Sequence, residues 1–162
     1  MDLKFDDSLF VGDVYTVFTE ANYGYNYTWL LPMYNYITFK VKSCKDAHIL
    51  LSTAFQDLSS NAYEIVLGGS ENTISAIRRG SLGQNVVQES TPNIMNCDTL
   101  LPFWVRWQNK TLEVGSGPVD SHVLMRLDDP KMPDISVASV TSWYSAPAEY
   151  QFLQTEGNQF SS

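Results

Sequence analysis

The sequence predicts an all-β fold, a single antiparallel β-sandwich of the jelly-roll type with about ten short strands. Two observations lead to this prediction. Short segments in which apolar side chains occupy every second position recur roughly every ten residues, with turn-forming residues between them. No stretch shows the apolar period of an amphipathic helix.

No linker, repeat or low-complexity tract divides the 162 residues. This length suffices for one full core, and a composition of 44% hydrophobic and 13% aromatic residues is globular. We therefore expect one domain over residues 1–162, with its core over 13–153 and loose termini at 1–12 and 154–162.

The expected strands follow one another along the chain. In the clearest, residues 34–42, Phe39 and Val41 share one face and the lysines lie on the other. Residues 20–32 are rich in Asn, Tyr and Gly, and we interpret them as an aromatic loop packed on the domain or as a ligand platform. The strands are expected at residues 13–18, 34–42, 47–52, 63–67, 73–79, 85–89, 103–107, 111–115, 122–127, 136–142 and 150–153.

Residues 63–79 predict a central hairpin around which the other strands are arranged. Two alternating segments flank residues 68–72, where glycine and asparagine favour a turn. In the expected register Glu64 faces Arg78, and Ile65 lies on the opposite, buried face. Such an opposite-charge pair across two strands stabilises a sheet by up to roughly 1 kcal/mol.

Composition limits the partners. The formal net charge of −8 argues against nucleic acid, since phosphate binding needs clustered Lys and Arg. No apolar run is long enough for a membrane helix, so we expect a soluble chain without membrane insertion. Cys44 and Cys97 allow one disulfide and lack a metal-binding spacing, and whether they are bridged stays open.

Two glycosylation sequons, Asn26-Tyr27-Thr28 and Asn109-Lys110-Thr111, accompany the even number of cysteines. Together they favour an extracellular or secreted protein. The first residues lack a signal peptide, so a cytoplasmic location is the alternative. The sequence leaves open whether either sequon is used.

Several motifs occur in a fixed order along the chain. They are Phe39-Lys40-Val41-Lys42, Asp46-Ala47-His48, Tyr63-Glu64-Ile65 with Gly68-Gly69, Asn72, Ser75 and Ile77-Arg78, then Phe103-Trp104-Val105-Arg106-Trp107, Val114-Gly115 and Val140-Thr141-Ser142-Trp143. This series resembles the farnesoic acid O-methyltransferase domain, a family widespread in arthropods and other invertebrates. Ser70 and Tyr144 depart from the family's pattern, which commonly has an aromatic residue and a glycine there.

The family's name implies methyl transfer from S-adenosylmethionine to farnesoic acid, and its members also occur as modules of extracellular multidomain proteins. Residues 112–117 look like the glycine-rich motif of methyltransferases that bind this cofactor. However, Pro118 and a strand-like segment follow, where such an enzyme needs a helix. We interpret the glycines as a turn leaving a hairpin, and expect no cofactor.

The other polar groups favour structural roles. His48 and Asp46 lack a nucleophile with a recognisable signature, so we expect no catalytic residue. Asp128, Asp129 and Asp134 offer oxygen ligands of the kind that Ca²⁺ prefers, but a solvated turn is the simpler interpretation and we expect no metal.

The candidate ligand site centres on Trp143 and Tyr144 in a loop after an apolar strand, with Asn72, Arg78 and Glu64 nearby. The predicted function is a non-catalytic binding module for carbohydrate or for a protein partner. A methyltransferase acting on farnesoic acid is one alternative. A structural adhesion module without a small-molecule ligand is another.

Overall fold

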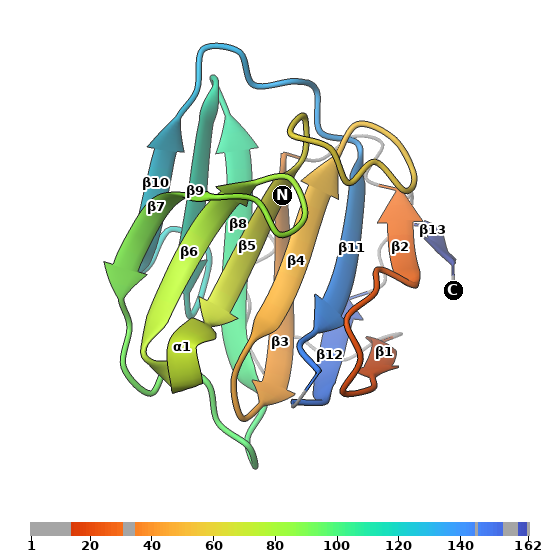
Figure 1. Ribbon diagram of the computed structural model, residues 1–162, viewed down its shortest axis with the longest axis vertical. Coiled ribbons are helices and arrows are strands. Elements are labelled where there is room, and N and C mark those ends of the chain that lie inside the picture. The colour runs from red at the N-terminus through yellow and green to blue at the C-terminus, as the bar shows by residue number, and fades with distance from the viewer. Residues whose placement is uncertain (1–13, 31–34, 145, 154–158, 162) are drawn as a thin grey trace.

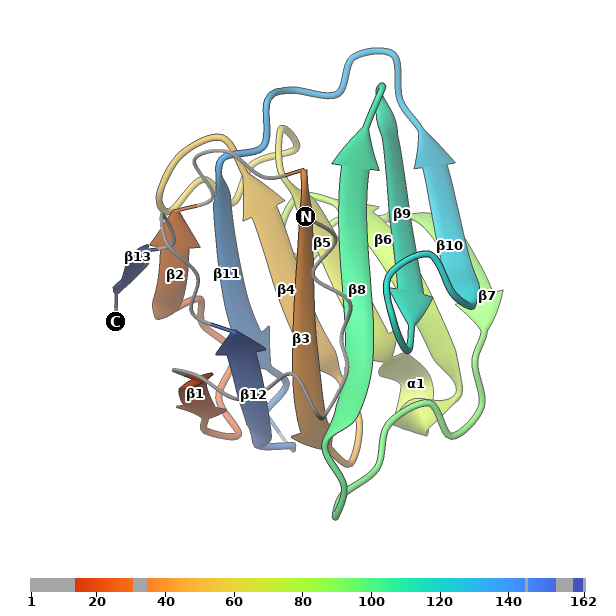
Figure 2. The same ribbon diagram turned by 180° about the vertical axis from the view of Figure 1, so that it is seen from behind.

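The structure, a computed structural model, describes residues 14–30, 35–144, 146–153 and 159–161. Two antiparallel sheets pack face to face as a β-sandwich (Figures 1 and 2). The six-stranded sheet has the order β1 (Val14–Thr19), β12 (Ala148–Leu153), β3 (Tyr36–Ser43), β8 (Leu101–Gln108), β9 (Thr111–Ser116) and β10 (Val123–Asp128). The seven-stranded sheet has the order β13 (Gln159–Ser161), β2 (Tyr27–Leu30), β11 (Val137–Ser142), β4 (Ala47–Ser52), β5 (Tyr63–Gly68), β6 (Ile74–Arg79) and β7 (Asn85–Ser90). The all-β prediction is therefore confirmed.

The core lies between the two sheets and is built by the predicted alternation. In β3 every second residue is buried, with Ile37, Phe39 and Val41 facing inward. Strands β4, β5 and β11 differ because all of their residues are buried. Their inward side chains contact the core, so their outward side chains must be covered by something else. That cover defines the candidate site described below.

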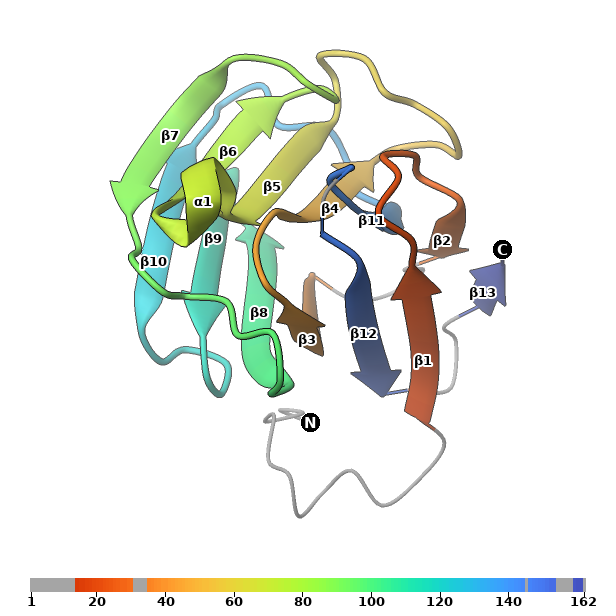
Figure 3. The same ribbon diagram turned by 60° about the horizontal axis from the view of Figure 1, so that its bottom comes forward.

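The β5–β6 hairpin has the predicted register, with Glu64 opposite Arg78 and Val66 opposite Ala76. Its turn is the single-turn element α1 (Gly69–Asn72), seen at the end of the two strands in Figure 3. Ser70, Glu71 and Asn72 all have positive φ, which costs on the order of 1–2 kcal/mol per residue.

Contacts of Asn72 offset this backbone strain. Its Nδ2 donates to the carbonyl of Met95, and its Oδ1 accepts from the backbone N–H of Met95, both at 3.0 Å. Gly68, with φ 72°, allows this close approach, because a Cβ there would lie 2.5 Å from the Met95 side chain. The turn is thus fastened to the segment that leads from β7 to β8.

A disulfide between Cys44 and Cys97 ties the same segment to the end of β3. It closes a loop over a sequence separation of 53 residues, which stabilises the fold by about 4 kcal/mol in the chain-entropy account. The pairing that the sequence left open is therefore made.

Two parts of the chain differ from the predictions. Residues 27–30, expected within an aromatic loop, form β2, which pairs with β11. The C-terminal segment expected to be loose includes β13, which pairs with β2. Both strands are too short to show a clear apolar period, and their backbone hydrogen bonds to neighbouring strands determine their conformation. The expected loose N-terminus, residues 1–12, lies outside the described residues.

Truncating Ile65 to alanine should lower the free energy of unfolding by about 2–5 kcal/mol, because this side chain is fully buried between the sheets. Urea titration followed by tryptophan fluorescence measures the change. Val86→Ala on the exposed edge strand β7 is the matched control and should change stability by less than about 0.5 kcal/mol. A similarly small effect of Ile65→Ala would contradict the packing described here.

Candidate functional site

The candidate site lies on the outer face of the seven-stranded sheet, where residues 20–26, the crossing segment, pass over β11 and the side chains of Tyr23 and Tyr25 reach β5. The backbone N–H of Gly24 donates to Thr141 Oγ1 at 3.0 Å and holds this crossing segment on β11. A small apolar group forms beneath it from Tyr25, Leu50 and Ala62. The crossing segment therefore covers the outward side chains of Leu50, Glu64 and Thr141 on these central strands.

At the centre of the site is Glu64, whose side chain is fully buried on this outer face. Its Oε2 accepts hydrogen bonds from the hydroxyls of Tyr23 at 2.5 Å and Tyr25 at 2.6 Å. Its Oε1 accepts from the backbone N–H of Leu82 at 3.0 Å and lies 3.3 Å from Nη1 of Arg78. One carboxylate therefore joins the crossing segment, β5, β6 and the loop after β6.

These contacts lower the pKa of Glu64. Burial alone would raise it, but hydrogen bonds and the neighbouring imidazole of His48 favour the ionised carboxylate and bring the pKa to about 2. The pKa values of the two tyrosine hydroxyls that donate to Glu64 shift in the opposite direction, upward. Burial and the negative charge of Glu64 raise the pKa of Tyr25, so this hydroxyl keeps its proton and remains a donor.

His48 lies beside this carboxylate, with Nδ1 3.5 Å from Glu64 Oε2 and only 2% of its side chain exposed. Its imidazole stacks on the indole of Trp143, with ring centres 5.9 Å apart and planes 18° apart. Tyr23 packs against the imidazole edge to face at 5.5 Å. Neither ring nitrogen makes a hydrogen bond to any residue in the described part of the chain.

Above His48, three aromatic residues form what we call the aromatic cluster: Tyr23, Trp143 and Tyr144. The ring centres of Trp143 and Tyr144 are 5.1 Å apart, and those of Tyr23 and Trp143 are 5.4 Å apart. Trp143 is half-buried and Tyr144 is 58% exposed. The cluster therefore presents aromatic surface to solvent while its base rests on buried polar groups.

The structure brings together four of the five predicted site residues. Trp143 and Tyr144 belong to the aromatic cluster, and Glu64 and Arg78 are joined directly beneath it. The fifth, Asn72, was grouped with them wrongly, because both ends of its amide are bonded to the Met95 backbone.

Sequence reasoning missed three residues of the site: Tyr23 and Tyr25, which donate to Glu64, and His48, which stacks on Trp143. The aromatic composition of residues 20–32 had suggested a ligand platform as one alternative. The pattern gave no sign that these tyrosines bind a carboxylate on β5.

The glycine motif at residues 112–117 has a packing role. Gly115 lies opposite Trp104 in the β8–β9 pairing, and a Cβ there would lie 2.3 Å from the buried indole. Gly117, with φ 79°, begins the turn that leads to β10. The predicted turn leaving a hairpin is confirmed, and a strand follows at the position where a methyltransferase motif has its helix.

The acidic residues considered for calcium have separate partners. Asp129 is bonded to Tyr63 and Arg79, and Asp128 accepts from Thr111 at 2.8 Å. In the described ranges, no three His, Cys, Asp or Glu side chains gather as a metal site. Over the same ranges, no helix has the length and apolar character needed to cross a membrane.

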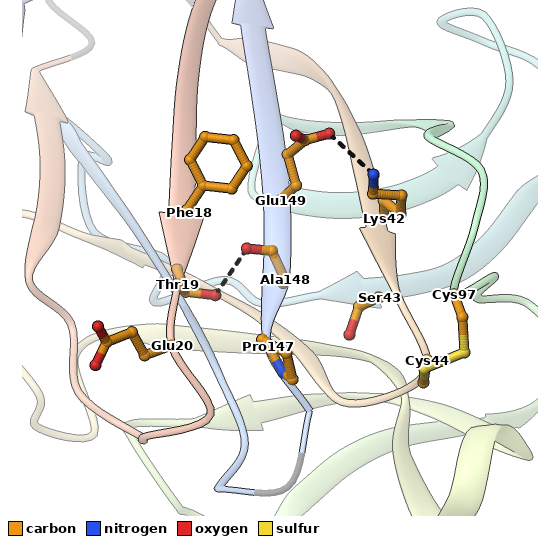
Figure 4. A pocket seen from close by; sticks show the side chains of 10 residues that line it. All are labelled: Phe18, Thr19, Glu20, Lys42, Ser43, Cys44, Cys97, Pro147, Ala148 and Glu149. Atoms are coloured by element: carbon orange, nitrogen blue, oxygen red, sulfur yellow. Dashed lines mark hydrogen bonds and ion pairs between the residues drawn. A yellow bond between two sulfur atoms is a disulfide. The ribbon is translucent and has the colours of Figure 1, made fainter.

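A separate hollow of about 380 Å³ lies on the outer face of the six-stranded sheet, beside the disulfide (Figure 4). Phe18 borders it with 63% of its surface exposed, and Lys42 pairs with Glu149 at 3.7 Å. This exposed ring lies on the opposite side of the sandwich from the aromatic cluster, which makes it a useful control.

Comparisons with known proteins bear on the family and on the fold. Residues 18–156 match the family described as "Farnesoic acid O-methyl transferase". "Uncharacterized protein 5" of Haliotis asinina is 35% identical over 107 residues, which are 65% of this chain and 61% of that protein. The chain thus spans about three fifths of the length of this curated relative.

Three solved structures resemble this chain to different degrees. Chicken galectin 2 has a TM-score of 0.55 at 9% identity, over 85% of this chain and 100% of that chain. A native glycosidic hydrolase has a TM-score of 0.47 at 11% identity, over 92% and 89% of the two chains. The carbohydrate-binding module CBM66 of Bacillus subtilis has 0.49 at 11% identity, over 94% and 90%. The galectin likeness shows a shared β-sandwich fold.

Glu64→Gln should remove a defined part of the pH dependence of stability. Because the folded-state pKa of about 2 lies below the ordinary value of 4.5, Glu64 stabilises the fold above pH 4.5 and loses this effect as the pH falls through about 2. Urea unfolding between pH 7 and pH 2.5 should therefore show a smaller loss of stability for the variant than for the natural chain.

The exposed carboxylate Glu71 provides the control for this measurement, since Glu71→Gln should keep the pH dependence of the natural chain. If Glu64→Gln also kept that dependence, the carboxylate would not be held ionised as described.

Proposed function

This chain belongs to the farnesoic acid O-methyltransferase family, and we propose that it is a binding module that takes carbohydrate on the outer face of its seven-stranded sheet. The observation that carries the proposal is the aromatic cluster, a partly exposed group of rings held on the buried side chains of Glu64 and His48 and the partly exposed Arg78.

The aromatic cluster supplies the apolar contact that sugars need. The C–H faces of a pyranose ring are apolar and pack on the face of an aromatic ring, while the hydroxyls at the rim of the sugar remain free for hydrogen bonds. Tyr144 is the most exposed ring of the cluster, and Trp143 meets it edge to face, with 69° between the ring planes. Two such rings offer a sugar one stacking surface and one wall.

Arg78 supplies donors for the sugar hydroxyls. Its Nη1 is held by Glu64 and its Nε donates to Asn85 Oδ1 at 2.9 Å, so the guanidinium is fixed on two sides. Its Nη2 makes no hydrogen bond to any residue that the structure describes, and 25% of the side chain is exposed. A guanidinium already oriented in this way loses little conformational entropy when it binds a ligand.

The disulfide supports an extracellular role as part of the same proposal. Disulfides form and persist mainly in oxidising compartments, and the Cys44–Cys97 bond joins two exposed positions. A recognition module that displays aromatic rings to solvent suits the cell surface or the extracellular space.

Methyl transfer, which the family's description names, would need a pocket that holds adenosine and methionine together and aims the methyl group at an acceptor. The glycines that suggested such a pocket have packing and turn roles here. We therefore give carbohydrate binding the preference over catalysis.

A glycan array probed with the full chain should identify a bound sugar, whose affinity calorimetry then measures. Tyr144→Ala should weaken this affinity about 2- to 13-fold, since losing an aromatic stacking partner costs about 0.5–1.5 kcal/mol. Phe18→Ala, which removes an equally exposed ring from the opposite sheet, should leave the affinity unchanged. An affinity insensitive to Tyr144→Ala would contradict the site, and an array without a bound sugar would contradict the function.

S-adenosylmethionine at concentrations on the order of tens of micromolar should show no saturable binding to this chain, whereas a specific ligand would saturate its site in about this range. Isothermal titration calorimetry measures binding, and a radiolabelled methyl assay with farnesoic acid measures turnover. Replacing Gly115 is not a suitable control, because a side chain there would clash with Trp104 and damage the fold. Saturable binding together with a labelled methyl ester would restore the enzyme hypothesis.

A further inference from the structure

We propose that Asn109 carries an N-linked glycan and that the first sugar of this glycan occupies the hollow beside it. The β8–β9 tip and residues 132–135 of the connection from β10 to β11 form this hollow. Attachment of this glycan rests on the extracellular location proposed above, and it is independent of any sugar bound as a ligand at the aromatic cluster.

Asn109, the residue that would carry the glycan, lies at an exposed hairpin turn. Asn109 and Lys110 form the two-residue turn between β8 and β9, both with positive φ (53° and 60°), as in the hairpin turns that favour asparagine. Figure 2 shows this tip at one end of the sandwich, below the connection from β10 to β11. Asn109 is exposed, and its side chain makes no hydrogen bond to any residue in the described ranges. Thr111 completes the sequon two residues later.

Directly beside this asparagine lies a hollow of about 410 Å³, a size typical of small-molecule sites. Its apolar part consists of Trp107, Met132 and Ile135, which are largely buried in the core. Its polar part includes the exposed residues Gln108 and Asp134.

N-acetylglucosamine, the first sugar of an N-linked glycan, matches this division. Its ring C–H groups and acetamido methyl can pack against the apolar part of the hollow. Its hydroxyls can form hydrogen bonds with the amide of Gln108 and the carboxylate of Asp134. Because Asn109 itself lines the hollow, a sugar attached to its side chain begins at the entrance. Lys110 reaches across with Nζ donating to the carbonyl of Met132 at 2.6 Å, which keeps the two sides of the hollow together.

The modification needs a lipid pyrophosphate-linked oligosaccharide and the transferase of the secretory pathway. The amide nitrogen of Asn109 forms a bond to the anomeric carbon of the first N-acetylglucosamine. The bond from that carbon to the pyrophosphate oxygen breaks, the lipid pyrophosphate leaves, and the amide loses one proton.

The test uses the full chain behind a secretion signal, expressed in a eukaryotic host that attaches oligomannose glycans. Peptide mass mapping should find Asn109 occupied in the secreted protein. Endoglycosidase H leaves the first N-acetylglucosamine in place, and the melting temperature should then stay within about 1 °C of the untreated value. Peptide-N-glycosidase F removes this sugar and converts Asn109 to Asp, and the melting temperature should fall by about 2–4 °C.

Two variants make the test specific. Asn109→Asp reproduces the product of complete removal without enzyme treatment, and should melt at the same lowered temperature. Asn26→Gln removes the other sequon, whose asparagine is also exposed, without adding a charge to the crossing segment, and the difference between the two enzyme treatments should persist in this variant. An unmodified Asn109 in the secreted protein would overturn the proposal, whatever the state of Asn26. An equal loss of stability after both enzymes would overturn the docking of the first sugar.

Discussion

The ionised carboxylate of Glu64, fully buried on the outer face of the seven-stranded sheet, is the constraint on which the candidate site depends. A buried charge without partners destabilises a protein by several kcal/mol, so this position is compatible with folding only when donors surround it. Those donors are the hydroxyls of Tyr23 and Tyr25, the Arg78 guanidinium and the backbone N–H of Leu82. Satisfying one carboxylate therefore places the crossing segment, and with it Tyr23 of the aromatic cluster, on the sheet.

Polar side chains that bond to distant parts of the chain also hold loops in place elsewhere in the fold. Asp129 is buried, and its bonds to Tyr63 and Arg79 hold the segment after β10 against the β5–β6 hairpin. Asn72 bonds the backbone of Met95 and holds the segment after β7 against the hairpin turn. All three contacts involve β5, β6 or their turn, so the hairpin at the centre of the sequence also organises the loops.

The sequence predicted what local alternation can reveal and missed what distant contacts decide. Most of the strands, the central register and the Glu64–Arg78 pair follow from a two-residue period, because a slip of one residue would expose the whole apolar face. The tyrosines that bind Glu64 lie 41 and 39 residues away from it in a segment without a period. Asn72 is close to the site in sequence, but its side chain is bonded to a different loop. The missed tyrosines and the misplaced Asn72 are both side chains whose partners lie far away in the sequence or in another loop, so only the tertiary fold determines them.

A double-mutant cycle between Tyr25→Phe and Glu64→Gln tests most directly whether this carboxylate holds the crossing segment on the sheet. Unfolding free energies of the natural chain, the two single variants and the double variant give the coupling energy of the pair. Because the Tyr25 hydroxyl donates directly to the ionised carboxylate, we predict a coupling of about 1–3 kcal/mol. Additive effects, within about 0.3–0.5 kcal/mol, would show that the two side chains stabilise the fold independently and would contradict the account.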